Sequence, residues 1–168
     1  MRRSPLSLAL LAVVVALPGC GGLGIFGGSD LTALEVAGRY RFVEYTLDPV
    51  SDAVREARLL GGTVSEDMTL LLREDGTAAL QRLRGDRVDE TLASGVFSVS
   101  GETVRLRFDD GDALDGIYMP REVAFEADGQ SLSAEAFREG VDLERISGNY
   151  RGITRADVTL RVRLREIG

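Results

Sequence analysis

The amino-acid sequence predicts an all-β fold: an antiparallel meander of strands, closed or nearly closed into a barrel, with one short helix after the first strand. Apolar and polar residues alternate along several segments, and glycine-containing turns separate these segments at short spacing. An open meander of this length would expose two edge strands, and pairing the last strand with the first removes both edges.

Alternation with a period of two residues is clearest in three segments. In each of them, apolar residues that would face a core are separated by residues that would face water. These segments are Thr103–Phe108, Arg121–Ala127 and Ala156–Ile167. We expect Gly38–Leu47 to form the first strand and Ala156–Ile167 to form the last, paired with it.

Hairpin turns are predicted between consecutive strands. Asp75-Gly76 follows Met68–Arg73, and Asp128-Gly129 precedes Ser131–Phe137. Asp-Gly is a strong hairpin signal because Gly adopts positive φ at little cost. Repeated short connections favour a meander, since parallel pairing would need crossovers of about a dozen residues or more.

One helix is expected between the first strand and a second strand near Met68. Asp48 or Ser51 could cap it, Pro49 suits its first turn, and Gly61-Gly62 would end it. The apolar residues with roughly helical spacing are Ala53, Val54, Ala57 and Leu60.

Composition argues against several classes of function. The chain has 168 residues, a formal net charge of −7, one Cys and no His. An acidic excess disfavours nucleic acid, and the absence of His removes the commonest general base and metal ligand. A single Cys excludes an intramolecular disulfide and a multi-Cys zinc site. Because no nucleophile–base pair is recognisable, we expect no enzyme activity, no cofactor and no metal.

The N-terminus has the pattern of an export signal. Met1-Arg2-Arg3 precedes the apolar stretch Leu6–Leu17, which is shorter than the roughly 20 residues that span a bilayer. Leu17-Pro18-Gly19-Cys20 resembles the bacterial lipobox, although Pro18 departs from the usual small residue. The resemblance implies cleavage before Cys20, a diacylglyceryl thioether on Cys20 and acylation of the new amine. An ordinary secretory signal peptide, with Cys20 incidental, is the alternative.

These features divide the chain into a lipoprotein signal peptide (1–19), a Gly-rich tether (20–30) and a single barrel domain (31–168). Several acyl chains at Cys20 would hold the protein firmly on a membrane. The absence of Asp after Cys20 resembles outer-membrane retention. We therefore expect a lipid-anchored protein of the cell envelope, on the periplasmic side of the outer membrane.

Three further segments resemble bacterial lipocalin-like lipoprotein domains. They are Gly38-Arg39-Tyr40, the hairpin Leu70–Thr77 with its Asp-Gly turn, and Gly95–Gly101. The resemblance implies a lipocalin-like barrel. Tyr40 stands where lipocalins usually have Trp, and the chain lacks the CxxC of the envelope-stress and copper-linked relatives, so their chemistry does not carry over.

Three clusters are candidate sites. Asp109–Gly116 holds four carboxylates and could bind Ca²⁺, but Leu114 and Arg121 occupy positions where an EF-hand needs oxygen ligands, and a solvated loop is the alternative. Arg84-Gly85-Asp86 spells an integrin-type tripeptide or forms a tight turn. Five arginines could form a cationic face that binds anionic lipid or an acidic partner. Alternatively, they could pair with acids on neighbouring strands. They are Arg151, Arg155, Arg161, Arg163 and Arg165.

Two functions fit this description. The first is a lipid-anchored module that binds a small apolar ligand or another envelope component. The second is a structural envelope lipoprotein whose barrel is filled by its own side chains, since small barrels can do either. Large and small residues are both expected to point inward: Tyr40, Phe42, Ala78, Ala93, Phe97, Phe108, Phe125, Ala134 and Ala136.

The lipobox predicts the effect of replacing Cys20. We expect Cys20→Ala to abolish acylation and to leave the precursor uncleaved or released, because Cys20 carries the only thiol. Metabolic labelling with a palmitate analogue measures this, with the unsubstituted protein as the reference. Equal labelling of the two proteins would contradict a lipid anchor at Cys20.

Overall fold

The computed structural model describes residues 31–168. The signal peptide, Cys20 and the Gly-rich tether lie outside the described residues and stay predictions. None of the helices within 31–168 is long and apolar enough to cross a bilayer.

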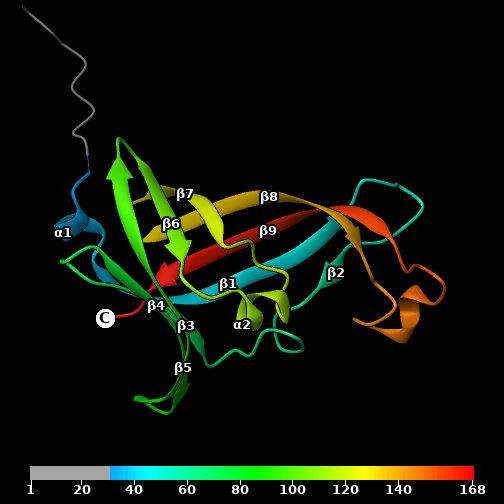
Figure 1. The fold of residues 1–168 in the computed structure, drawn as a ribbon, viewed down its shortest axis with the longest axis horizontal. Coiled ribbons are helices and arrows are strands. Elements are labelled where there is room, and N and C mark those ends of the chain that lie inside the picture. Colours follow the sequence, from blue (N-terminus) through cyan, green and yellow to red (C-terminus); the bar gives the residue numbers. More distant parts are fainter. Residues whose placement is uncertain (1–30) are drawn as a thin grey trace, which may run out of the picture.

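The described chain forms a closed antiparallel barrel of eight strands with one short strand added beside it (Figure 1). Strands β1 and β3–β9 make the barrel, and β2 pairs with the end of β1. The strands are β1 (Gly38–Pro49), β2 (Ala57–Arg58), β3 (Met68–Leu72), β4 (Thr77–Arg84), β5 (Arg87–Ser100), β6 (Thr103–Phe108), β7 (Glu122–Asp128), β8 (Ser131–Val141) and β9 (Ala156–Glu166). The helical turns are α1 (Ala33–Val36), α2 (Asp112–Asp115) and η1 (Gly148–Tyr150).

The predicted closure of the barrel is confirmed. β1 pairs with β9 along most of its length, from Tyr40 opposite Glu166 to Pro49 opposite Val158. A bulge near Val43 shifts the register once. The other edge of β1 pairs first with β3 and then with β2, so β1 has a strand on both sides at each end.

The predicted hairpins are confirmed as well. Gly76, Gly85, Gly101 and Gly129 all adopt positive φ between 58° and 80° in the turns that join β3 to β8. Arg84-Gly85-Asp86 is the tight turn between β4 and β5. β5 continues straight through Gly95, where a Cβ would lie 2.8 Å from the Cα of Phe108 on β6.

The predicted helix after the first strand is wrong. The segment that follows β1 forms a turn, closed by the Val54 amide donating to the Ser51 carbonyl at 3.0 Å, and then β2. Ala57 and Leu59 are buried with exposed Arg58 between them, and the Leu59 amide donates to the Tyr45 carbonyl at 2.9 Å. Pairing with β1 buries both apolar side chains, and this tertiary gain outweighs a weak helical pattern.

Helical turns occur elsewhere in the described chain. α1 precedes β1 and begins with a capping box, in which Thr32 and Glu35 each accept from the other's amide. α2 lies in the loop between β6 and β7. Each has four residues, so its stability depends on packing against the barrel rather than on helix propensity.

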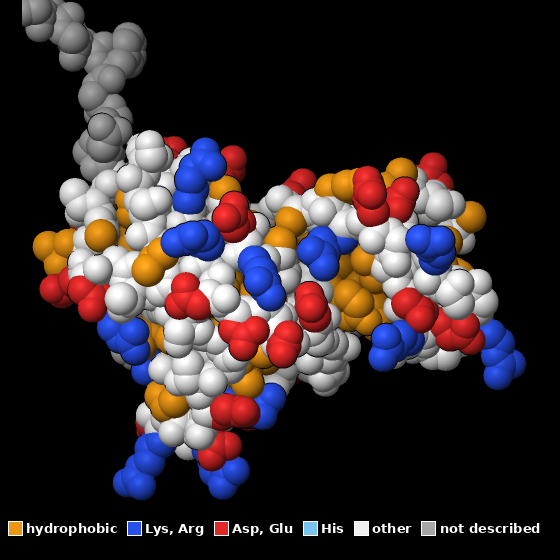
Figure 2. Space-filling view, viewed as in Figure 1, with side chains coloured by type: hydrophobic (Ala, Val, Ile, Leu, Met, Phe, Trp, Pro, Cys, Tyr) orange, Lys and Arg blue, Asp and Glu red, His pale blue; other side chains and the backbone are white. Residues whose placement is uncertain are grey.

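The inward-facing side chains form one continuous core. Eight of the nine residues that were expected to point inward are buried, and Ala136 is partly buried against the same core. β1, β8 and β9 extend beyond the barrel, and their far ends lie beside a smaller lobe made of β2, η1 and their loops (Figure 1). Figure 2 shows hydrophobic side chains in the hollow between this lobe and the barrel.

The two ends of the barrel differ. The end where the described chain begins, here called the near rim, carries α1 and the turns at Gly76, Gly101 and Gly129. The Leu31 amide donates to the Gly101 carbonyl at 3.2 Å at this rim. The opposite end, the far rim, carries the α2 loop and the smaller lobe.

Two adjacent residues of β9 point to opposite faces of the barrel wall, so their substitution can show which face is buried. Val162 is 3% exposed and faces the core, whereas the side chain of Arg163 is 58% exposed. We expect Val162→Asp to cost several kcal/mol, because it buries an unpaired charge. Arg163→Asp should cost about 1 kcal/mol or less, since it replaces an exposed ion pair with an exposed repulsion. Urea unfolding compares the two, and similar losses would contradict this assignment of faces.

Candidate functional site

The interior of a small barrel can hold a ligand, but here side chains fill it. Tyr45, Leu80 and Leu164 are each 0% exposed and come from three different strands. Side chains of this size, packed at the usual density of a protein core, leave little room for a second molecule.

Both ends of the interior are covered, and a tyrosine of β1 fastens each cover. At the near rim, the Tyr40 hydroxyl donates to the Val36 carbonyl of α1 at 2.9 Å. At the far rim, the Tyr45 hydroxyl donates to the Ile117 carbonyl at 2.9 Å, and Leu114 of α2 is fully buried. The covers therefore belong to the core and are held by hydrogen bonds that are themselves buried.

The pockets lie outside the barrel. The pockets described below have volumes of about 320 to 660 Å³, and all of them open onto the surface. One of them, which we call the β7–β8 groove, has a volume of about 660 Å³. It is lined by Glu44, Thr103, Ala124, Phe125, Glu126, Ser133, Ala134, Glu135, Arg161, Val162 and Arg163.

The groove exists because β7 and β8 separate soon after their turn. They pair at three positions only, ending at Glu126 opposite Ser133. Beyond that point β7 stays with β6 and β8 stays with β9. The core residues Phe125, Ala134 and Val162 therefore contribute to the floor of a groove whose walls are outward-facing polar side chains.

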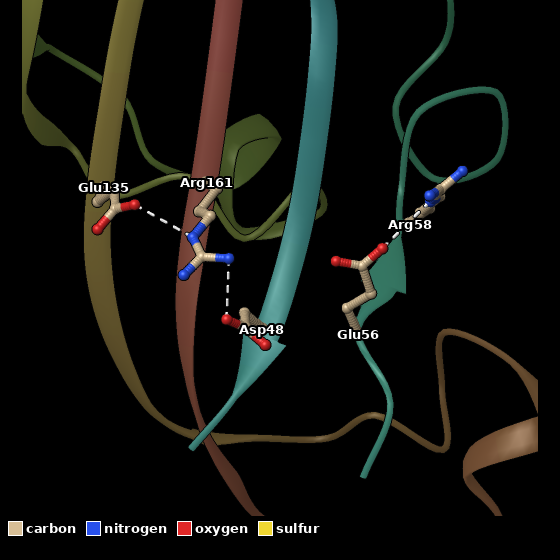
Figure 3. A network of polar contacts seen from close by, with 5 residues as sticks. All are labelled: Asp48, Glu56, Arg58, Glu135 and Arg161. Carbon is tan, nitrogen blue, oxygen red and sulfur yellow. Dashed lines mark hydrogen bonds and ion pairs between the residues drawn. The ribbon is translucent and has the colours of Figure 1, made fainter. Parts of the chain in front are cut away.

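Arginines of β9 form ion pairs along one wall. Arg161 lies between two acids, with its Nε 3.1 Å from Glu135 of β8 and its Nη1 3.0 Å from Asp48 of β1 (Figure 3). Arg163 Nη2 lies 2.8 Å from Glu44. Of the five arginines in the predicted cationic face, Arg161 and Arg163 are thus paired with acids on neighbouring strands. Within residues 31–168, Arg151, Arg155 and Arg165 form no ion pair, and Arg165 lies opposite Arg41 of β1.

These ion pairs add little to stability. The Arg161 side chain is 43% exposed, and exposed pairs contribute about 0–1 kcal/mol each. A second, separate pair on this face joins Glu56 and Arg58 beside β2 (Figure 3). Arg161 and Arg163 therefore contribute paired charges to the groove wall, beside Glu44 and Glu135.

The acidic loop Asp109–Gly116 covers the far rim. Within residues 31–168, no group of three or more His, Cys, Asp or Glu side chains is arranged to hold a metal ion. One of its carboxylates is used locally, since Asp110 accepts from the Asp112 amide at 3.1 Å. The guanidinium of Arg121 lies against Gly111 of this loop. The described geometry therefore gives the Ca²⁺ interpretation no support.

Sequence patterns located the arginine stripe but missed the groove. Glu126, Ser133 and Glu135 look like ordinary outward positions of two strands in the sequence. Where β7 and β8 part depends on the twist of the whole barrel, and no residue at that point signals it.

Comparison with known proteins identifies no family. No family model matches this chain, and no curated protein matches it. The resemblance to lipoprotein signals and lipocalin-like domains therefore rests on the sequence motifs and the barrel fold.

The two buried tyrosines predict alkaline sensitivity. Burial raises the pKa of Tyr40 to about 12, with Glu166 adding to the shift, and burial also raises the pKa of Tyr45. A phenol in the unfolded chain titrates near 10. Because the pKa values of both tyrosines are higher in the folded protein, the two neutral phenols contribute to the free energy of unfolding. This contribution is complete below about pH 10 and is lost as the pH rises through the folded pKa values.

We therefore expect the free energy of unfolding to fall between about pH 10 and 12. Tyr45→Phe should lower stability at pH 8 by about 1–3 kcal/mol, because the Ile117 carbonyl loses its donor. It should also reduce the loss between pH 8 and 11. Urea unfolding at both pH values measures this, and an unchanged loss in Tyr45→Phe would contradict a role for Tyr45 ionisation.

Proposed function

We propose that this protein is a lipid-anchored envelope lipoprotein whose barrel acts as an interaction module and contacts another envelope component through its outer surface. The lipobox pattern at Cys20 supports the anchor. The outer surface is chosen because the interior is packed and covered at both ends, while a groove of about 660 Å³ opens outside between β7 and β8.

A small apolar ligand inside the barrel fits the described residues less well. Sites for such ligands are concave cavities of about 300 Å³ or more. Creating that space here would require displacing fully buried side chains such as Leu47 and Phe125. Each displacement would cost stability of the order of large core truncations, about 2–5 kcal/mol.

The anchor would orient the barrel. The described chain begins at the near rim, where Leu31 bonds to Gly101. A Gly-rich tether of residues 20–30 would reach on the order of 20 Å. The near rim would then face the membrane, and the β7–β8 groove would widen toward the far rim, away from the lipid.

No catalytic step is part of this proposal. The chain has no His, and its net charge of −7 disfavours nucleic acid as a partner. A structural lipoprotein with a filled barrel and no partner is the second candidate, and the same packed core favours it. The two candidates differ in whether the groove is occupied in the cell.

Occupancy of the groove can be tested by site-specific photo-crosslinking in cells. A photoreactive residue at Ser133, in the groove, should give a discrete crosslinked band, because a partner would lie against it. The same residue at Glu74, exposed in the β3–β4 turn, is the control and should give none. The Ser133 band should disappear with Cys20→Ala, which removes the anchor.

The interior is tested separately by native mass spectrometry of the mature protein. We expect the mass of the acylated polypeptide alone. A stoichiometric small apolar compound would overturn the outer-surface proposal in favour of an internal ligand. Absence of any band from Ser133 in cells would favour the purely structural candidate.

A further inference from the structure

We infer that the split between β7 and β8 binds an extended basic segment of a partner protein, which adds as a strand to the open edge of β8. This inference rests on the proposed function and names the chemistry of the partner. The split is the region beyond Glu126 and Ser133, where the two strands no longer pair.

Two strand edges are open at the split. β8 pairs with β9 from Ser131 to Val141, and β7 pairs with β6 from Glu122 to Glu126. Beyond Ser133, no strand among residues 31–168 pairs with the other edge of β8. The barrel is therefore closed at β1 and β9 but interrupted here, and open edges of this kind are templates for an added strand.

The free backbone groups can be assigned from the register. Gln130 accepts from the Glu166 amide at 2.8 Å, so even-numbered residues of β8 direct their backbone groups toward β9. Those of Glu135 and Phe137 therefore face the split. On β7, the Ala127 amide donates to the Glu102 carbonyl at 2.8 Å, which places the backbone groups of Ala124 at the split.

The charged side chains that would lie directly beside an inserted strand favour a basic partner. The outward side chains that border it include Glu122 and Glu126 on β7 and Glu135 and Glu139 on β8, all exposed. Among the described residues only Glu135 of these four has an ion-pair partner, Arg161. Neither strand edge carries an outward Lys or Arg, and the nearest outward arginines lie one strand farther away, Arg105 and Arg107 on β6 and Arg161 and Arg163 on β9. An inserted strand would thus have acids on both sides of its outward face.

The opposite face of an inserted strand would meet apolar groups first and, farther along β8, the half-buried Arg138. Phe125 and Ala134 lie at the floor of the groove, and Ala136 is only partly buried. The outward ring of Phe137, 58% exposed, can contact the aliphatic stems of basic side chains. The matching segment therefore alternates Arg or Lys on its outer face with apolar residues on its inner face.

A second copy of this chain fits the edge poorly. Two β8 strands pairing antiparallel about Phe137 would place Glu135 of each opposite Glu139 of the other. Like charges directly opposite one another destabilise a strand pair. The net charge of −7 on each copy acts in the same direction.

The binding test uses the mature protein in detergent and a fluorescent peptide of alternating Arg and Val, followed by fluorescence anisotropy. One control peptide replaces each Arg by Glu, and another replaces each Val by Pro, which cannot form a strand ladder. We expect the Arg-Val peptide to bind at least about tenfold more tightly than either control. Equal binding of the Glu peptide would overturn the charge assignment.

Phe137→Pro tests strand addition directly. It removes an N–H that faces the split and leaves the β8–β9 hydrogen bonds intact, whereas Phe137→Ala keeps the N–H and is the matched control. We expect Phe137→Pro to weaken peptide binding about tenfold or more relative to Phe137→Ala. A folded Phe137→Pro protein that binds as tightly as Phe137→Ala would overturn the inference.

If Phe137→Pro does not fold, hydrogen exchange of the unsubstituted protein tests strand addition instead. The amides of Glu135 and Phe137 in the unsubstituted protein should become protected when the Arg-Val peptide is added, and unchanged exchange would overturn strand addition. Dimers that exclude the peptide, seen by sedimentation, would assign the edge to a second copy instead. A failed titration with an intact Ser133 crosslink would reject this inference alone, whereas loss of the crosslink would reject the proposed function.

Discussion

The pairing of β1 with β9 is the constraint on which the rest of the structure depends. It joins the first and last strands along nine paired positions and turns a meander with two open ends into a barrel. Without it, both strands would expose unpaired backbone groups. β1 also carries Tyr40 and Tyr45, whose hydroxyls fasten the covers at the two rims. One strand thus closes the barrel around its circumference and at both ends.

Closure by this route has a consequence for function. Hydrogen bonds from Tyr40 and Tyr45 hold the covers in place, and the inward side chains pack together. The interior of the described chain is therefore a hydrophobic core. In the proposed function, recognition would take place at the outer surface. The outer face of β8, β9 and β1 is crossed by exposed ion pairs that contribute little stability but fix which charges border the groove.

The β7–β8 split is the one place in the described barrel where two neighbouring strands of the circuit stop pairing early. Natural sheets usually protect open edges with charged side chains, and four exposed glutamates lie along the two edges of this split. The same acids discourage self-association and favour a basic strand. A protective feature against unwanted pairing can therefore double as a filter for one class of partner.

The sequence by itself determined the all-β class, the hairpins and the pairing of the first strand with the last. Period-two alternation and Asp-Gly turns such as Asp75-Gly76 are local signals, and they fix strands wherever one face is buried. Only the tertiary structure decided that Ala57 joins β2 rather than a helix, that the interior is filled, and that β7 leaves β8 after Glu126. Those outcomes depend on which surfaces meet across the barrel and on how its strands twist, and residues close in sequence carry no record of either.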